Sequence, residues 1–328
     1  MARWIGTSAL PRCSMRVLIT GGAGFIGRHI AEHFHDQAEV RVLDNLRSGF
    51  KSNLCGLKCE LIVGSVLDRE LVREAMKGVD FVFHLAAMVS VPESVSKPAE
   101  CAEINAGGTA IVLEEAARAQ VKKLIFSSSA AIYGDNPATP TIESMPGAPK
   151  SPYAASKYEG ERYCDAFTQE GRLATVCLRY FNVFGPYQNP RSEYAAAVPA
   201  FIEKAIRNEP ITIFGDGRQP RDFIYVSDVA AANAFFALKS QATGIFNVGC
   251  GSEITINDLA LTICKLTNSS STIEYGAERL GDVRHSVAGV DKAQNAGFTP
   301  VCDLAGGLRV TVEFFRKHVA GIEQERHL

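Results

Sequence analysis

Tyr153 and Lys157 have the spacing of a catalytic pair. Residues four positions apart lie on one face of a helix, so the phenol and the ammonium would be neighbours. Tyrosine has a pKa of about 10, and a general base at neutral pH needs that pKa lowered by about three units. A nearby cation lowers it by favouring the phenolate. The pair therefore indicates proton transfer, although a Tyr-x-x-x-Lys sequence by itself is more often a solvated pair.

A serine cluster offers a further group for this chemistry. The stretch 123–126, whose last three residues are apolar, is typical of a strand, and Ser127, Ser128 and Ser129 follow it directly. A hydroxyl at the carboxyl end of that strand, that of Ser129, would reach the same substrate oxygen as Tyr153. Together with the nucleotide-binding pattern described next, the serines favour a catalytic interpretation of the pair.

The stretch 17–27 is typical of a turn that holds a nucleotide. The apolar run 17–19 is followed by Gly21, Gly24 and Gly27, and then by the helical pattern 29–35. Glycine allows the backbone to approach a pyrophosphate, and the start of the helix offers free N–H groups and a positive dipole end. Because ordinary turns also use glycine, the next strand has to support this interpretation.

Asp44 gives that support at the end of the predicted strand 41–44. A carboxylate there receives the hydroxyls of the adenosine ribose and repels a 2′-phosphate, so we expect NAD rather than NADP. Arg47 and Lys51 follow closely and could tolerate a phosphate. The positive nicotinamide ring of NAD would also help to lower the pKa of Tyr153.

Composition excludes several other classes of protein. The 328 residues are 46% hydrophobic and carry a net charge of -2, so a sizeable core is expected and a strong basic field for nucleic acid or anionic lipid is not. The nine scattered cysteines favour reduced thiols in a cytoplasmic protein, with no metal site. No apolar run reaches the roughly 18–20 residues that span a bilayer, so we expect no membrane association. Residues 1–14 are expected to be a loosely held extension, with a faint likeness to a targeting segment.

Strands and helices alternate through the first half of the chain. Strands are predicted at 17–19, 41–44, 60–63, 81–87 and 123–126, and helices at 69–77, 99–119 and from Pro152 to about 168, after a loop at 138–152. This order predicts an α/β fold, a doubly wound parallel sheet, over residues 15–178. Residues 179–328 contain shorter elements, including a strand at 211–214 and helices near 195–207 and 304–318. We expect them to form a smaller α/β substrate-binding domain interleaved with the first.

These features together resemble the extended short-chain dehydrogenase/reductase family, and within it the 4-epimerases of UDP-hexoses and UDP-N-acetylhexosamines. The resemblance covers nearly the whole chain from Met15. Its motifs lie at residues 21–27, 84–87, 90–92, 126–129, 153–157, 179–182, 215–217, 221–223 and 279–282.

The resemblance implies a role for individual residues. Ser129, Tyr153 and Lys157 would be catalytic, with Lys157 also binding the nicotinamide ribose. The residues expected at NAD are Gly21, Gly24, Phe25, Ile26, Gly27, Asp44, Asn45, Ser65, Val66, Leu85, Ala86, Ala87, Ser127, Tyr153, Lys157, Tyr180 and Val183. The residues expected at a UDP-sugar are Ser90, Ser129, Asn182, Val198, Thr212, Phe214, Arg221, Arg279, Asp282 and Ser286.

Within the substrate set, Asn182 and Arg221 would hold the diphosphate, and Thr212 and Phe214 would frame the uracil. Arg279 would take a phosphate and Asp282 the uridine ribose. An arginine suits a diphosphate because its planar, permanently charged group donates in pairs. The alternative for Arg221 beside Asp222 is an ordinary structural ion pair.

The implied reaction inverts C4 of the sugar through a 4-keto intermediate. Related dehydratases place Asp-Glu after the catalytic hydroxyl, and related decarboxylases keep the Glu, whereas this chain has Ala130 and Ala131. Relatives that exclude an N-acetyl group carry a tyrosine where this chain has Ser286, so UDP-GlcNAc/UDP-GalNAc is expected, with UDP-Glc/UDP-Gal as a further pair. The alternative is a UDP-glucuronate epimerase, although those relatives usually have Thr at the position of Asn182.

The chain departs from the family pattern at two positions, and the family also implies an oligomeric state and one alternative without catalysis. Ser65 and Gly289 stand where the family often has acids. A homodimer through helices 99–119 and 153–168 is expected from the family. Some proteins of this fold bind a dinucleotide without catalysis, but these often lose the tyrosine or the lysine, and this chain has both.

Overall fold

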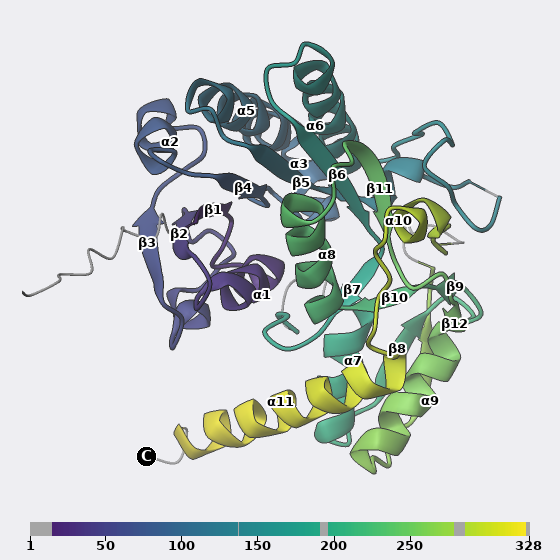
Figure 1. Cartoon of the computed structure of the whole chain (residues 1–328). Coiled ribbons are helices and arrows are strands. Elements are labelled where there is room, and N and C mark those ends of the chain that lie inside the picture. Colours follow the sequence, from purple (N-terminus) through teal and green to yellow (C-terminus); the bar gives the residue numbers. More distant parts are fainter. Residues whose placement is uncertain (1–14, 137, 191–195, 279–285, 326–328) are drawn as a thin grey trace, which may run out of the picture.

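The computed structural model describes residues 15–136, 138–190, 196–278 and 286–325, and within these ranges seven parallel strands form the central sheet (Figure 1). The strands are β1 Arg16–Thr20, β2 Glu39–Asp44, β3 Cys59–Val63, β4 Phe81–His84, β5 Lys123–Ser129, β6 Thr175–Tyr180 and β11 Gly244–Val248. Their order is β11-β6-β5-β4-β1-β2-β3, which confirms the predicted doubly wound sheet. The order reverses between β1 and β4, where ligands bind in such sheets.

Helices cover both faces of this sheet (Figure 1). On one face lie α1 Phe25–Phe34 and α8 Val226–Leu238, whose apolar side chains join one core cluster with the sheet. On the other lie α2 Arg69–Ala75, α5 Gly108–Arg118 and α6 Pro152–Gln169, which bury a second cluster. Since a parallel sheet is buried on both faces, its strands are almost continuously apolar.

The predicted helix 99–119 is interrupted. It consists of α4 Pro98–Ala102, a π turn at Glu103–Gly107 and α5. Asn105 lies in the π turn and is buried; its Oδ1 accepts from Met88 N at 2.7 Å, and its Nδ2 donates to Ser156 Oγ at 2.9 Å. The turn lets one buried amide hold both the loop after β4 and helix α6, which apolar periodicity could not reveal.

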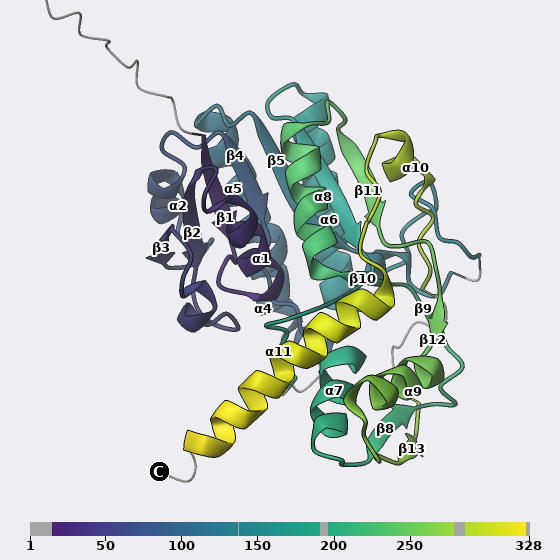
Figure 2. The same ribbon diagram turned by 60° about the horizontal axis from the view of Figure 1, so that its bottom comes forward.

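The second part of the chain builds a smaller layer beside the carboxyl ends of the strands (Figures 1 and 2). Its strands pair in twos, as β7 Asn182–Phe184 with β10 Phe223–Tyr225, β8 Ile211–Phe214 with β13 Ile273–Gly276, and β9 Pro220–Arg221 with β12 Ile254–Thr255. Helices α7 Ala197–Ile206, α9 Ile256–Thr267 and α11 Leu304–Glu325 pack around them on a third core cluster. Between these elements, α8 and β11 return to the large sheet.

Short elements complete the chain. They are the single turns η1 Lys51–Leu54 and η3 Ala130–Tyr133, and helices α3 Val91–Ser96 and α10 Asp291–Asn295. The eight cysteines within the described ranges are all free thiols. No helix in the part of the chain that the structure describes combines the length and the apolar character required to cross a bilayer.

Gly160 sets how closely α6 approaches the sheet. A Cβ at this position would lie 2.5 Å from Cζ of the buried Phe126. We expect Gly160→Ala to lower the free energy of unfolding by about 1–3 kcal/mol because a packed ring has to shift. Urea unfolding measures this change. Gly107→Ala is the matched control, since a Cβ there meets no atom within 4 Å. Equal stability of the two variants would contradict this packing argument.

Candidate active site

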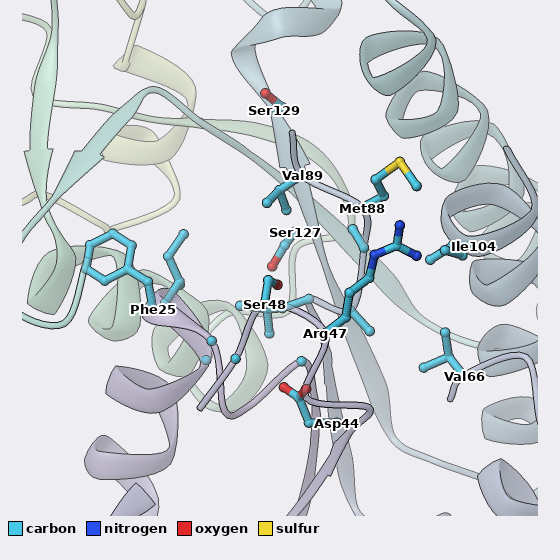
Figure 3. A pocket seen from close by; sticks show the side chains of 18 of the residues that line it. Phe25, Asp44, Arg47, Ser48, Val66, Met88, Val89, Ile104, Ser127 and Ser129 are labelled. Carbon is cyan, nitrogen blue, oxygen red and sulfur yellow. The ribbon is translucent and has the colours of Figure 1, made fainter. Parts of the chain in front are cut away.

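One cavity of about 460 Å³ opens at the carboxyl ends of the central strands (Figure 3). Every residue predicted to contact NAD lies along its wall, and so does Ser129. Cavities of this size are typical of small-molecule sites. The following wall residues are not among those predicted to contact NAD: Leu43, Arg47, Ser48, Gly49, Gly64, Met88, Val89, Ile104, Ser128, Phe181, Gln188, Asn189 and Ala196. Five of them adjoin a predicted residue at a strand end, which is the signal that could have found them: Leu43, Gly64, Met88, Ser128 and Phe181.

The glycine turn is shaped by close backbone contacts. Gly21 has φ +71°, and a Cβ on it would lie 2.7 Å from Ala86 N. A Cβ on Gly27 would lie 2.4 Å from Gly21 O. Gly24 is the N-cap of α1, so the N–H groups of the first turn face the cavity without partners inside the helix. These features fit a pyrophosphate.

Asp44 joins the turn to the end of β2. Its Oδ2 accepts from Ala23 N at 2.9 Å, and its Oδ1 accepts from Leu46 N at 2.8 Å. The carboxylate is buried and lines the cavity (Figure 3). Each oxygen keeps acceptor capacity for a ribose hydroxyl. The residues present therefore fit the adenosine half of a dinucleotide.

Ser129, Tyr153 and Lys157 converge at the opposite end of the cavity. The side chain of Ser129 lies beside the phenol of Tyr153, and its Oγ accepts from Ala131 N at 3.1 Å. Lys157 Nζ donates to Ser127 O at 2.8 Å. Strand β5 thus supplies the serines, and one face of α6 supplies the tyrosine and the lysine.

Burial is the main cause of the pKa shifts of Tyr153 and Lys157. It lowers the pKa of Lys157 from 10.5 to about 8. It raises the pKa of Tyr153, while the side chain of Ser129 acts in the opposite direction. This differs from the expectation that Lys157 lowers the pKa of the phenol, because desolvation of the phenolate is the larger effect here.

His84, the last residue of β4, is buried near Lys157 and is neutral. Burial is the main reason that its pKa falls to about 3, and the charge of Lys157 adds to the effect. Thr109 Oγ1 donates to Asn105 O at 2.5 Å, so it accepts from His84 Nε2 at 3.0 Å. Nδ1 then accepts from Thr20 Oγ1 at 2.6 Å. These hydrogen bonds place the proton of His84 on Nε2. The histidine thereby helps to hold the loop after β4 in place.

Among the described residues, the predicted substrate residues other than Ser129 do not line this cavity. Ser90 caps α3 through Glu93 N at 3.2 Å, and Val198, Thr212 and Phe214 belong to α7 and β8. Arg279 and Asp282 lie outside the described residues.

Three predicted substrate residues come from one neighbourhood. Asn182 Nδ2 donates to Asp222 O at 2.8 Å, and Arg221 forms an isolated β-bridge with Ser286. Asp222 accepts from the backbone N–H groups of Cys250 and Gly251, both at 2.9 Å. The buried carboxylate of Asp222 thus binds backbone N–H groups rather than Arg221, and it lies beside the three predicted substrate residues.

Comparison with known proteins places this geometry in a family. Residues 17–249 match the model of the NAD dependent epimerase/dehydratase family. The chain belongs to this family. A UDP-glucose 4-epimerase of Mycolicibacterium smegmatis is 37% identical over 312 residues, which cover 92% of this chain and 99% of that one.

Solved structures agree with this assignment. A UDP-N-acetylglucosamine 4-epimerase of Methanobrevibacter ruminantium, in complex with UDP-N-acetylmuramic acid, has a TM-score of 0.90 and 40% identity, covering 93% of this chain and 99% of that one. A UDP-glucose 4-epimerase of Thermus thermophilus in complex with NAD has a TM-score of 0.86 and 37% identity, covering 92% and 99%. This chain is therefore an NAD-dependent nucleotide-sugar epimerase, and its relatives support 4-epimerisation of a UDP-sugar.

Removal of the Tyr153 hydroxyl tests the predicted base of this epimerase. We expect Tyr153→Phe to lower kcat by about 100-fold or more, because proton transfer by a placed side chain contributes that much. Bound NAD, measured in the supernatant after denaturation, should stay near the wild-type content because the ring remains in the wall. Substantial activity in this variant would exclude Tyr153 as the base.

Lys157 should make the stability of the epimerase depend on pH. Its folded pKa is about 8 and its ordinary value is 10.5, so the unfolded chain binds the proton more tightly. The cost of burying the ammonium is complete below about pH 8 and disappears as the pH rises toward about 10.5. We expect the wild type to gain on the order of 2 kcal/mol relative to Lys157→Met between about pH 7 and about pH 10. Parallel denaturant titrations of the two proteins measure this, and a constant difference would contradict it.

Proposed function

We propose that this chain interconverts UDP-GlcNAc and UDP-GalNAc by inversion at C4, with UDP-Glc and UDP-Gal as further substrates. The observation that supports epimerisation most directly is the convergence of Ser129, Tyr153 and Lys157 at one end of the NAD cavity. Support for the acetylated sugar comes from the small side chain at Ser286.

The chain's own residues would divide the proton chemistry. Tyr153 as phenolate takes the proton of the sugar 4-hydroxyl, while Ser129 hydrogen-bonds the same oxygen and holds it in place. NAD, when bound, would supply reversible hydride transfer at C4, and inversion would require the 4-keto sugar to turn its opposite face to the cofactor. Tyr153 then gives the proton back to the oxygen. Burial raises the pKa of Tyr153 in the structure, so the positive charges of Lys157 and of the nicotinamide ring would have to offset it for the phenolate to form.

The described wall of the cavity has no carboxylate near Ser129, and this argues against dehydration. Among the described residues that line it, the one carboxylate is that of Asp44, at the adenosine end. Ala130 and Ala131 form the turn directly after Ser129 and supply no acid or base. Loss of water from the sugar needs a proton donor near the leaving hydroxyl, and epimerisation does not.

Ser286 lies beside residues expected at the substrate. Its backbone O accepts from Asp222 N at 2.9 Å, and it forms a β-bridge with Arg221. If Arg221 holds the diphosphate, Ser286 lies next to it in the chain fold, and the family resemblance implies that this position lies near C2 of the sugar, where a serine leaves more room than a tyrosine. Asn182, rather than threonine, favours this substrate over a UDP-uronate.

Ser286→Tyr should separate the two substrate pairs. We expect the variant to lose about tenfold or more of its kcat/KM for UDP-GlcNAc, because the ring fills the space of the N-acetyl group, and to keep its activity on UDP-Glc. Chromatographic separation of the 4-epimers after incubation with NAD measures both. The control is the wild type on UDP-Glc, UDP-GlcNAc and UDP-glucuronate. Turnover of UDP-glucuronate alone would replace the proposed substrate, and equal loss on both hexoses would refute the role of Ser286.

A further inference from the structure

Arg47 spans the cofactor cavity at the end beside Asp44. It follows β2, lines the cavity and extends from the Asp44 side toward Met88 and Ile104 (Figure 3). Its Nη2 lies 2.6 Å from Glu93 Oε1 in α3, and its Nη1 lies 2.5 Å from Glu100 Oε1 in α4. One guanidinium thus joins the loop after β2 to two helices that follow β4.

The loop that carries Arg47 is fixed to the glycine turn. Phe50 N donates to Ala23 O at 3.1 Å, and Asn53 Nδ2 donates to the same oxygen at 2.8 Å. Gly49 packs so closely that a Cβ there would lie 2.7 Å from Ala23 C. Arg47 therefore extends from a wall that also holds the pyrophosphate turn.

The opposite wall is connected to the catalytic helix. Ser90 Oγ caps α3 by accepting from Glu93 N, and Ser94 Oγ accepts from Tyr153 N at 3.2 Å. An ion pair between the two walls consequently links the adenosine end of the site to α6.

These pairs form a small, partly exposed network. Lys97 Nζ lies 3.4 Å from Glu93 Oε1 and 3.8 Å from Glu100 Oε2, so two cations balance two carboxylates. The side chains of Arg47, Glu93 and Glu100 are 33%, 32% and 40% exposed. Exposed pairs are individually weak and are screened by salt, which makes such a link able to open.

We propose that Arg47, Glu93 and Glu100 form a clasp over the NAD site that slows the release of NAD. The chemistry gives a reason for retention, since the hydride removed from the substrate has to be returned by the same cofactor molecule. The clasp concerns NAD alone, so its test is independent of the sugar.

The clasp predicts faster loss of NAD from an Arg47 variant. The purified holoenzyme is diluted, and the NAD released over time is collected by ultrafiltration and quantified without any sugar. We expect Arg47→Ala to release NAD about three- to tenfold faster than the wild type, as loss of two exposed ion pairs allows. Arg172→Ala is the matched control, since Arg172 pairs with Glu170 and does not line the cavity. It should release NAD at the wild-type rate, and an unchanged rate in Arg47→Ala would overturn the proposal.

A mutant cycle separates the clasp from a direct contact between Arg47 and NAD. We expect E93Q/E100Q to accelerate release as well, and the triple variant with Arg47→Ala to be no faster than Arg47→Ala alone. Raising NaCl from about 0.05 M to about 0.5 M should accelerate release from the wild type more than from Arg47→Ala. Additive effects in the cycle would overturn the proposal, and so would equal salt dependence of the two proteins.

Discussion

The site depends on the burial of one ammonium group. Lys157 is 4% exposed, and its Nζ has Ser127 O as a hydrogen-bond acceptor at 2.8 Å and the ring of Phe126 at 4.9 Å. Enclosing a charge costs several kcal/mol unless nearby groups compensate. Helix α6 therefore has to lie close against β5, which the missing side chain of Gly160 permits. The same position of α6 brings the phenol of Tyr153 to Ser129. The packing that buries Lys157 therefore also sets the geometry for proton transfer.

A buried polar network extends this arrangement toward the second part of the chain. Glu161, one turn after Lys157, accepts from Ser128 Oγ at 2.5 Å and pairs with Arg179 at 2.6 Å. The guanidinium of Arg179 lies 4.6 Å from the ring of Tyr133, whose hydroxyl donates to Asn247 at 2.6 Å. The Asn247 amide in turn donates to Thr141 O and Gly289 O, at 2.8 and 3.1 Å. Glu161 and Arg179 compensate each other's charge, although Arg179 Nη1 has no hydrogen-bond partner among the described residues. The network ends within a few residues of Ser286. The large sheet and the segment expected at the substrate are thus held by the same hydrogen bonds.

The sequence predicted the sheet and the residues along the cofactor cavity because both follow from local patterns. Apolar runs ending in glycine or small residues specify strands whose carboxyl ends meet, and Gly21, Asp44 and Ser129 lie at such ends. The π turn at Asn105, the tautomer of His84 and the clasp of Arg47 could not be predicted, since each depends on partners far away in the chain. The direction of the Tyr153 pKa shift was also missed, because spacing reports a neighbouring charge but not the depth of burial. At Gly289 the sequence showed a departure from the family pattern without a reason. The structure gives the reason for a glycine there, since a Cβ would lie 2.5 Å from Ile142 Cγ2.

The two halves of the proposed site are built by different means. The cofactor half uses the ends of β1, β2, β4 and β5 in one continuous sheet, so its side chains are fixed by the same hydrogen bonds that make the fold. The residues expected at the substrate stand on short strand pairs and isolated bridges, such as Arg221 with Ser286. If Ser286 lies at the sugar, as we propose, a change there would alter the space for the sugar without moving Tyr153 or Lys157. Members of one family can keep the hydride chemistry and differ in substrate for this physical reason, and the preference for an N-acetyl group has to be argued from those few positions rather than from the fold.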